Sequence, residues 1–216
     1  DVYKRQQIFS SKQIFSTGQV FSARLLVEGP TFHLIKRVCE FAADAGYTGI
    51  EIAPFTLGEN PHELSSNQRG DLRRIIAQAG LECIGLHWLL AKTEGLHVTS
   101  PDADTRSRTI SYLTDLARLC RDLGGKTLVF GSPQQRSLMA DVTEQDAHLF
   151  LQEVFGALVP TLEETDTVLA LEPLAPIETN VLTTADETRH LIDSIGSPHI
   201  RLHLDVKAMA SEDLSI

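Results

Sequence analysis

Two kinds of hydrophobic pattern alternate along the chain from about residue 30 onward. Longer segments carry apolar residues three or four positions apart and end at glycine, as in residues 31–46, a pattern typical of amphipathic helices. Short apolar runs, such as residues 167–174, are typical of buried strands. We expect helices in residues 31–46, 65–80, 100–125, 143–166 and 183–197, and strands in residues 47–55, 81–90, 126–132, 167–174 and 200–206, with a first strand within 21–29.

Several helix ends carry their own signals. Ser100 followed by Pro101 predicts an N-cap and a first helical position, and Thr183 or Thr184 is expected to cap the helix over 183–197. Pro160 is expected to kink the helix over 143–166 or to split off its end, because proline lacks the N–H that an interior position needs. Ser211 predicts the start of one more helix.

Strands and helices therefore alternate, and strand starts recur roughly every 30 to 45 residues, the length of one βα unit. Two architectures accept such a run: a doubly wound sheet and a (β/α)8 barrel. A doubly wound nucleotide-binding fold is expected to carry GxGxxG or GxxxxGK[ST] in its first turn, and the sequence has neither. We therefore favour an α/β (β/α)8 TIM barrel, of which about six βα units are present.

The composition of the chain argues against some classes of binding partner. The formal net charge of -10 argues against nucleic acid and anionic membranes, and no apolar run reaches the ~18 to 20 residues of a membrane span. Cys39, Cys83 and Cys120 are widely spaced and lie in apolar runs, so we interpret them as buried thiols of a cytoplasmic protein.

Residues 1–22 are interpreted as an artefactual or disordered N-terminus, with the barrel over residues 23–216. The opening "DVYKRQ" fits no element and, back-translated, matches the end of an adaptor used in preparing DNA libraries. The alternative is a genuine polar N-terminal tail.

The two faces of the expected strands differ in chemistry, because side chains alternate across a strand. One face is small and, near the strand ends, polar: it carries Glu51, His87, Glu172 and Asp205, and Cys83 lies on the same side as His87. The other face is aliphatic or aromatic and suits packing against helices: Ile50, Ile52, Ile84, Leu86, Leu128, Phe130, Leu169, Leu171, Leu202 and Leu204.

In a barrel, the four polar side chains would converge at the carboxyl ends of the strands. Carboxylates and an imidazole that converge are natural ligands of a divalent cation. Simpler alternatives stay open: Glu51 as a helix cap or ion-pair partner, and His87 as a hydrogen-bonded core histidine. Glu172 and Asp205, which end successive strands, favour a functional site.

Six segments in this order, "GYTGIEIAPFTL", "GLHWLL", "EGLHVTSPD", "LGGKTLVFGSPQQR", "ALEPLAPIETN" and "HLDVKAMASE", resemble the sugar phosphate isomerase/epimerase family. This family belongs to the xylose-isomerase-like TIM-barrel superfamily, with the ketose 3-epimerases and the endonuclease IV-type enzymes. The resemblance covers roughly residues 25–216. It implies that the chain is a C-terminally truncated fragment without the last two βα units, and inactive as it stands.

The resemblance also implies a metal site. Glu172 falls on the strand-5 Glu and Asp205 on the strand-6 Asp that hold Mn2+, Mg2+ or Co2+ in the family, and the two remaining ligands would lie beyond Ile216. Glu172 would also be one of two glutamates that move a proton next to a carbonyl, with a metal-stabilised enediolate. The implied substrate is a small-molecule sugar or sugar phosphate.

Further positions are expected to contact the substrate. By resemblance, Glu178 would bind substrate hydroxyls and His87 would line the pocket, and Glu51 faces the same space. Arg136 is expected to meet a phosphate or carboxylate, with a solvated arginine as the alternative, and Lys207 to meet an anionic substrate, with a helix cap as its alternative. Phe55 and Trp88 would form an apolar wall.

One departure weakens a simple ketose 3-epimerase assignment. In those enzymes a histidine follows the strand-6 Asp by three positions, and this chain has Ala208 there. Gly131 and Ser132 stand where endonuclease IV-type enzymes carry a histidine, so DNA repair is not expected. The alternatives are an inositol-type keto-sugar dehydratase and a non-catalytic sugar-binding barrel. A homo-oligomer is possible on the sequence alone.

Overall fold

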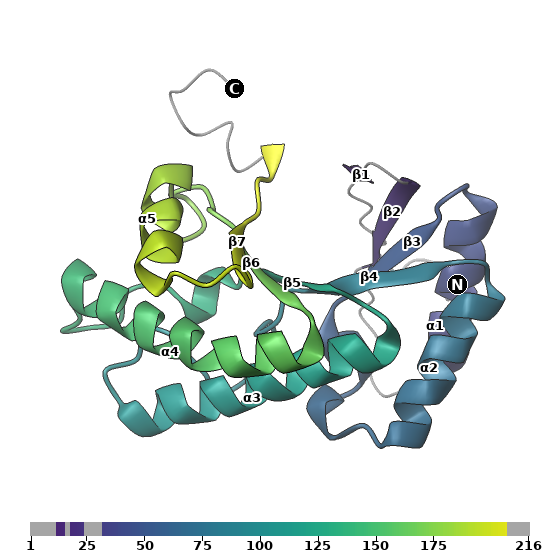
Figure 1. Ribbon diagram of the computed structural model, residues 1–216, viewed down its shortest axis with the longest axis horizontal. Coiled ribbons are helices and arrows are strands. Elements are labelled where there is room, and N and C mark those ends of the chain that lie inside the picture. The colour runs from purple at the N-terminus through teal and green to yellow at the C-terminus, as the bar shows by residue number, and fades with distance from the viewer. Residues whose placement is uncertain (1–11, 16–17, 24–31, 207–216) are drawn as a thin grey trace, which may run out of the picture.

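The computed structural model describes residues 12–15, 18–23 and 32–206, with the backbone alone for the first two ranges. The strands of these residues form one sheet in chain order (Figure 1). β1 runs antiparallel to β2, and each later strand pairs in parallel with the one before it. The strands are β1 (Lys12–Phe15), β2 (Gly18–Ala23), β3 (Gly49–Ile52), β4 (Glu82–His87), β5 (Thr127–Phe130), β6 (Val168–Leu171) and β7 (Ile200–Leu202).

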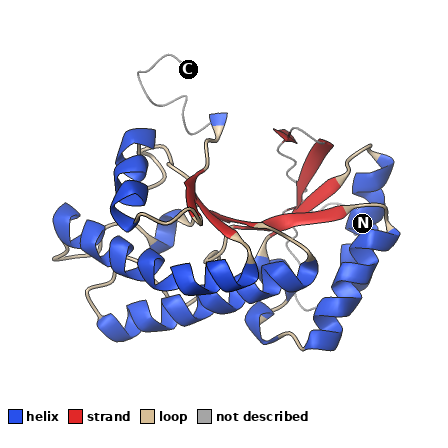
Figure 2. Cartoon of the chain, viewed as in Figure 1, coloured by secondary structure: helices blue, strands red, loops and turns tan. Residues whose placement is uncertain are grey.

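The helices lie on the outer face of the curved sheet, and its other face carries no helix among the described residues (Figure 2). This is the arrangement of a TIM barrel seen over part of its circumference, as the alternation of strands and helices predicts. The α-helices are α1 (Phe32–Asp44), α2 (Ser66–Gln78), α3 (Ala103–Leu123), α4 (Glu144–Thr165) and α5 (Ala185–Ile195), and the short 3-10 turns are η2 (Pro54–Leu57), η3 (Pro61–Glu63) and η4 (Pro133–Gln135).

The core lies between sheet and helices, on the face that the sequence assigns to large side chains. Leu128, Phe130, Leu169 and Leu171 belong to it, and all are at most 1% exposed. Burial of this apolar surface is the main force that holds the layers together. Leu204 departs from the expectation: β7 ends at Leu202, and the Leu204 side chain is 50% exposed.

β4 contains an irregularity that the alternation rule does not foresee. Its register with β3 shifts between Ile50, which pairs with Cys83, and Glu51, which pairs with Gly85. Because paired residues of parallel strands share a face, the extra residue Ile84 turns inward, beside Gly49, and Cys83 turns to the helix core. The predicted faces of Cys83 and Ile84 are therefore wrong, whereas Leu86 and His87 keep theirs.

Two helix predictions need correction. α3 begins after Asp102 and not after Ser100, because the Asp102 carboxylate accepts hydrogen bonds from the N–H groups of Asp104 and Thr105. α4 runs without a break through Pro160. Pro160 lies on the exposed side of α4, where water can satisfy the carbonyl that loses its partner. Thr184, one of the two expected caps, is the N-cap of α5.

Three further predictions concern the two ends of the chain and the cysteines. β2, which overlaps the strand expected within residues 21–29, begins earlier, at Gly18, and β1 lies within residues 1–22, for which no strand was expected. The expected helix from Ser211 lies outside the described residues. All three cysteines are buried and free, as predicted.

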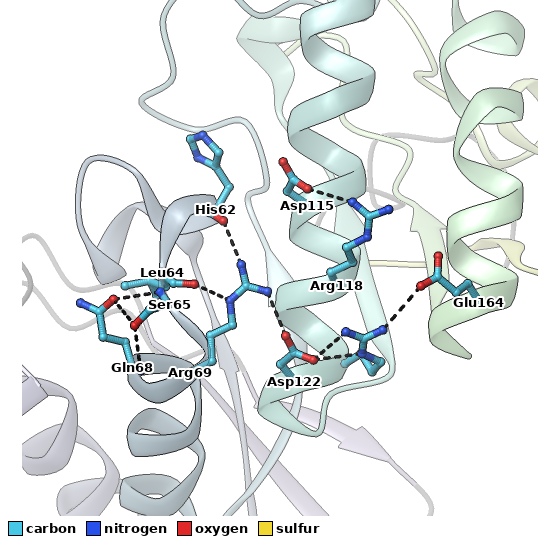
Figure 3. Close-up of polar contacts among 10 residues, drawn as sticks. His62, Leu64, Ser65, Gln68, Arg69, Asp115, Arg118, Asp122 and Glu164 are labelled. Atoms are coloured by element: carbon cyan, nitrogen blue, oxygen red, sulfur yellow. Dashed lines mark hydrogen bonds and ion pairs between the residues drawn. The ribbon is translucent and has the colours of Figure 1, made fainter.

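A buried arginine ties the segment before α2 to α3 (Figure 3). Arg69 donates from Nε to the carbonyl of Leu64, from Nη2 to the carbonyl of His62 and from Nη1 to the Asp122 carboxylate, at 2.8 to 2.9 Å. Two adjacent βα units are thereby joined on the helix side of the sheet. This network serves architecture, because it holds η3 against α3.

Candidate active site

Glu172 is the first residue after β6, and its main chain is held on both sides. Its N–H donates to the carbonyl of Phe130 in β5 (3.1 Å), and its carbonyl accepts from Nη1 of Arg136 (2.7 Å). Its carboxylate lies over Gly131, where a Cβ would come within 2.6 Å of Oε2. The strand end and the glycine beside it therefore fix where the carboxylate lies.

The environment raises the pKa of Glu172 to about 7. Burial is the largest cause, and the negative charge of Asp205 is the next, with smaller contributions from Glu178 and Glu51. The Arg136 guanidinium acts in the opposite direction. A carboxyl group with such a pKa exchanges a proton near neutral pH, as a general acid or base must.

Asp205 follows β7 by three residues and is half-buried. After burial, its negative charge is the largest cause of the raised pKa of Glu172. Among the described residues, however, no three His, Cys, Asp or Glu side chains come close enough to hold a metal ion together.

His203 is a site residue that sequence reasoning missed. Its Nε2 atom lies 4.0 Å from Oε1 of Glu172, and both side chains are largely buried. Burial lowers the pKa of His203, against the opposing effect of Asp205, so the imidazole is neutral near pH 7. The available signal was its position two residues before Asp205, which puts both on one face of the strand.

Glu51 lies within β3 and is 2% exposed. Its Oε1 atom has no hydrogen-bond partner in the described part of the chain, and burial raises the pKa of the carboxyl to about 7. A buried carboxyl without a partner for one oxygen is costly. The strand register from β3 to β6 puts Glu51 on the same face of the sheet as Glu172.

His87 and two aromatic residues line another part of this face. His87 is the last residue of β4 and is half-buried, with its ring 6.2 Å from that of Trp88. Trp88 has a φ of 54°, which ends the strand there, and its ring lies 6.4 Å from that of Phe55. The indole is 37% exposed, so an apolar surface is open to a ligand.

Arg136 is not the exposed loop arginine that the alternative expected. Its side chain is 0% exposed, and its two Nη atoms donate to the carbonyls of Glu172 and Leu182. Burial lowers the pKa of Arg136 to about 10, against the pull of Glu172 and two further glutamates, so the group stays charged. Both terminal nitrogens are therefore occupied by the protein's own main chain.

Two further predicted contacts, Glu178 and Lys207, remain to be placed. Glu178 is exposed in the loop between β6 and α5, where its N–H donates to the carbonyl of Ala175 at 2.8 Å. Its charge reaches both Glu172 and Arg136. Lys207 lies outside the described residues.

The fold defines a class of protein: a TIM-barrel chain, in which active sites lie at the carboxyl ends of the strands. The family described as "Xylose isomerase-like TIM barrel" matches residues 39–214. Because the match covers most of the chain, the protein belongs to this family.

Two proteins of similar sequence are sugar epimerases by name. A probable ketose 3-epimerase of Synechocystis sp. is 27% identical over 173 residues, 79% of this chain and 56% of that protein. An L-ribulose 3-epimerase of Mesorhizobium japonicum is 26% identical over 147 residues, 68% of this chain and 48% of that protein. The chain thus spans about half the length of these relatives.

Solved structures show the same fold. A crystal structure of D-psicose 3-epimerase in the presence of D-fructose superposes with a TM-score of 0.72 and 18% identity, over 84% of this chain and 61% of the other. At 18% identity, this similarity is evidence for the fold alone.

No helix in the described ranges combines the length and the apolar character needed to cross a bilayer.

Proposed function

We propose that the complete protein is a divalent-metal-dependent epimerase or isomerase of a ketose or ketose phosphate. One observation carries the proposal: Glu172, at a strand end in a family with ketose 3-epimerase members, has a buried carboxyl whose pKa is raised to about 7. Such a group can remove a proton next to a carbonyl and return it. Glu172 is therefore the proposed catalytic residue.

The residues of the site fit a divalent cation in their chemistry. Glu172 and Asp205 repel each other, and a cation between oxygen ligands would relieve that repulsion. We assign these two carboxylates as ligands, to be joined by further groups. When bound, a divalent metal polarises the substrate carbonyl and stabilises negative charge that develops on its oxygen.

The remaining residues have binding roles in this proposal. The exposed part of Trp88, beside Phe55, suits the apolar C–H face of a sugar. His87, Glu178 and Glu51 present polar groups to hydroxyls, and we keep Lys207 as a contact of an anionic group. Arg136 is not kept as a substrate contact, because its side chain is 0% exposed and both terminal nitrogens donate to main-chain carbonyls.

The test uses the complete gene product, a panel of ketoses and ketose phosphates, and Mn2+. We expect exchange of the substrate C–H proton with solvent deuterium, and loss of that exchange in Glu172→Gln. Glu163→Gln, an exposed substitution on α4, is the matched control and should keep the activity. Full exchange in the Glu172 variant would contradict the role given to this residue.

A second candidate is dehydration of an inositol-type keto-sugar. The observation that favours it is Ala208, which stands where the ketose 3-epimerases have histidine. A dehydratase would also remove a proton next to a carbonyl, but the substrate would then lose a hydroxyl group as water, so the product would be lighter by one water molecule. Mass spectrometry of the product separates the two, and sugar binding without either product would indicate a non-catalytic barrel.

A further inference from the structure

Arg136 lies between the end of β6 and the loop that follows it, and it is hydrogen-bonded to both. Its guanidinium is buried in a loop, and burying a charge is costly unless the group is paired and hydrogen-bonded. The main chain around it is anchored: its N–H donates to the carbonyl of Pro133, and its carbonyl accepts from Oγ1 of the buried Thr99 (3.3 Å). The arginine is thus a fixed point from which two other segments are held.

The first of these segments is the end of β6. The carbonyl of Glu172 accepts from Nη1 at 2.7 Å, and the N–H of the same residue donates to Phe130 at 3.1 Å. Because the N–H and the carbonyl of Glu172 are both hydrogen-bonded, the direction of its Cα–Cβ bond is fixed. The carboxylate is then confined above Gly131, with His203 4.0 Å away.

The second segment is the end of the loop that carries Glu178. The carbonyl of Leu182 accepts from Nη2 of Arg136 at 3.1 Å, and its N–H donates to Oε1 of Glu187 at 2.8 Å. Leu182 has a φ of 54°, a left-handed conformation that a leucine seldom adopts. The peptide groups of Leu182 thus link the guanidinium to a carboxylate of α5, which holds this conformation in place.

We propose that Arg136 is the positioning residue of the candidate active site: its guanidinium joins the end of β6 to the end of the next loop, and so sets the places of Glu172 and Glu178. This inference rests on the proposed function for its catalytic meaning, whereas the geometric part stands by itself. A lysine cannot replace it fully, because only the planar guanidinium presents two donors in a fixed fork.

The chain offers a matched control. Arg106 is 8% exposed, and its Nη1 atom donates to the carbonyls of Ser100 and Pro101 at 2.8 and 3.2 Å. Arg106 lies in the first turn of α3 and pairs with Glu153 of α4 at 2.9 Å. Arg106→Met therefore removes a buried guanidinium with two main-chain bonds, as Arg136→Met does, but without a link to Glu172.

The experiment compares Arg136→Met, Arg136→Lys and Arg106→Met in the complete gene product. Hydrogen–deuterium exchange should show lost protection in residues 172–184 for both Arg136 variants, less for lysine, and unchanged protection there for Arg106→Met. Mn2+ binding, measured by calorimetry, should weaken about 10- to 100-fold in Arg136→Met. If Arg136→Met does not fold, the loss of protection in residues 172–184 of Arg136→Lys decides whether Arg136 holds these segments.

The outcomes separate the two proposals. Unchanged exchange in residues 172–184, or equal loss in the Arg106 variant, overturns the positioning role. A wild-type protein that binds no Mn2+ contradicts the proposed function, and the exchange data then still decide whether Arg136 holds the two segments. Weakened Mn2+ binding of equal size in Arg106→Met would also count against a specific role of Arg136.

Discussion

Oε2 of Glu172 lies only 2.6 Å from the point that a Cβ at position 131 would occupy. Gly131 follows β5 and Glu172 follows β6, and these strands pair residue by residue up to Phe130 and Leu171. The glycine therefore provides the space in which the carboxylate lies. The same register makes the end of β5 part of the site although Gly131 has no side chain of its own.

Gly131→Ala is expected to impair function more than stability. The new methyl group would meet the end of a side chain, which can move, so folding should be little affected. The Glu172 carboxylate would shift from its place, and a shift of about 1 Å can cost on the order of 100-fold in rate. The rate of substrate proton exchange in the complete protein, with the melting temperature measured alongside, checks this. Wild-type activity would show that the position of the carboxylate is not critical.

Gly85→Ala is expected to impair stability more than function. A Cβ there would lie 1.9 Å from the carbonyl oxygen of Thr127, a main-chain atom that cannot move without breaking the β4–β5 pairing. Overpacking typically costs about 1–3 kcal/mol, and contact with main chain should bring this change to the upper end or beyond. The midpoint of urea unfolding measures the loss. Gly156→Ala is the control, because a Cβ there meets nothing within 4 Å outside the helix backbone.

Stability should fall as the pH rises from about 4.5 to 7. Burial raises the pKa of Glu51 from 4.5 to about 7, so between these values the folded state binds more protons than the unfolded state. Ionisation at higher pH then favours unfolding, by an amount on the order of 3 kcal/mol for one such group. Unfolding in urea at pH 5 and pH 8, with EDTA present, measures this slope. Glu51→Gln should reduce the slope to the part that comes from Glu172, whose pKa is also raised to about 7, and an unchanged slope would show that Glu51 is not a source.

The cysteines should resist thiol reagents in the native protein. Burial raises the pKa of Cys39 to about 11 and that of Cys83 to about 12, and Cys120 is raised further by the same cause. Only the thiolate reacts, so the folded chain should be labelled by iodoacetamide far more slowly than the unfolded chain. Mass spectrometry of native and urea-unfolded samples at pH 8 counts the labels. Rapid labelling of Cys83 in the native state would contradict its place in the helix-side core.

The polar positions of the site could be found in the sequence because strand side chains alternate. Glu172 and Asp205 end successive apolar runs, and the structure brings their charges together. His203 followed from the same rule and was overlooked. Lys207 and the remaining expected ligands cannot be placed from the described residues.

From α1 onward, the sequence by itself determined the order of strands and helices and the parallel sheet that they form. Local periodicity carries this information, because each element must bury one side. Tertiary structure alone decided that Cys83 and Ile84 exchange faces, since a register shift depends on the neighbouring strand. It also decided that Arg136 is buried between Glu172 and Leu182, because its partners are main-chain carbonyls 36 and 46 residues away, which no side-chain pattern encodes.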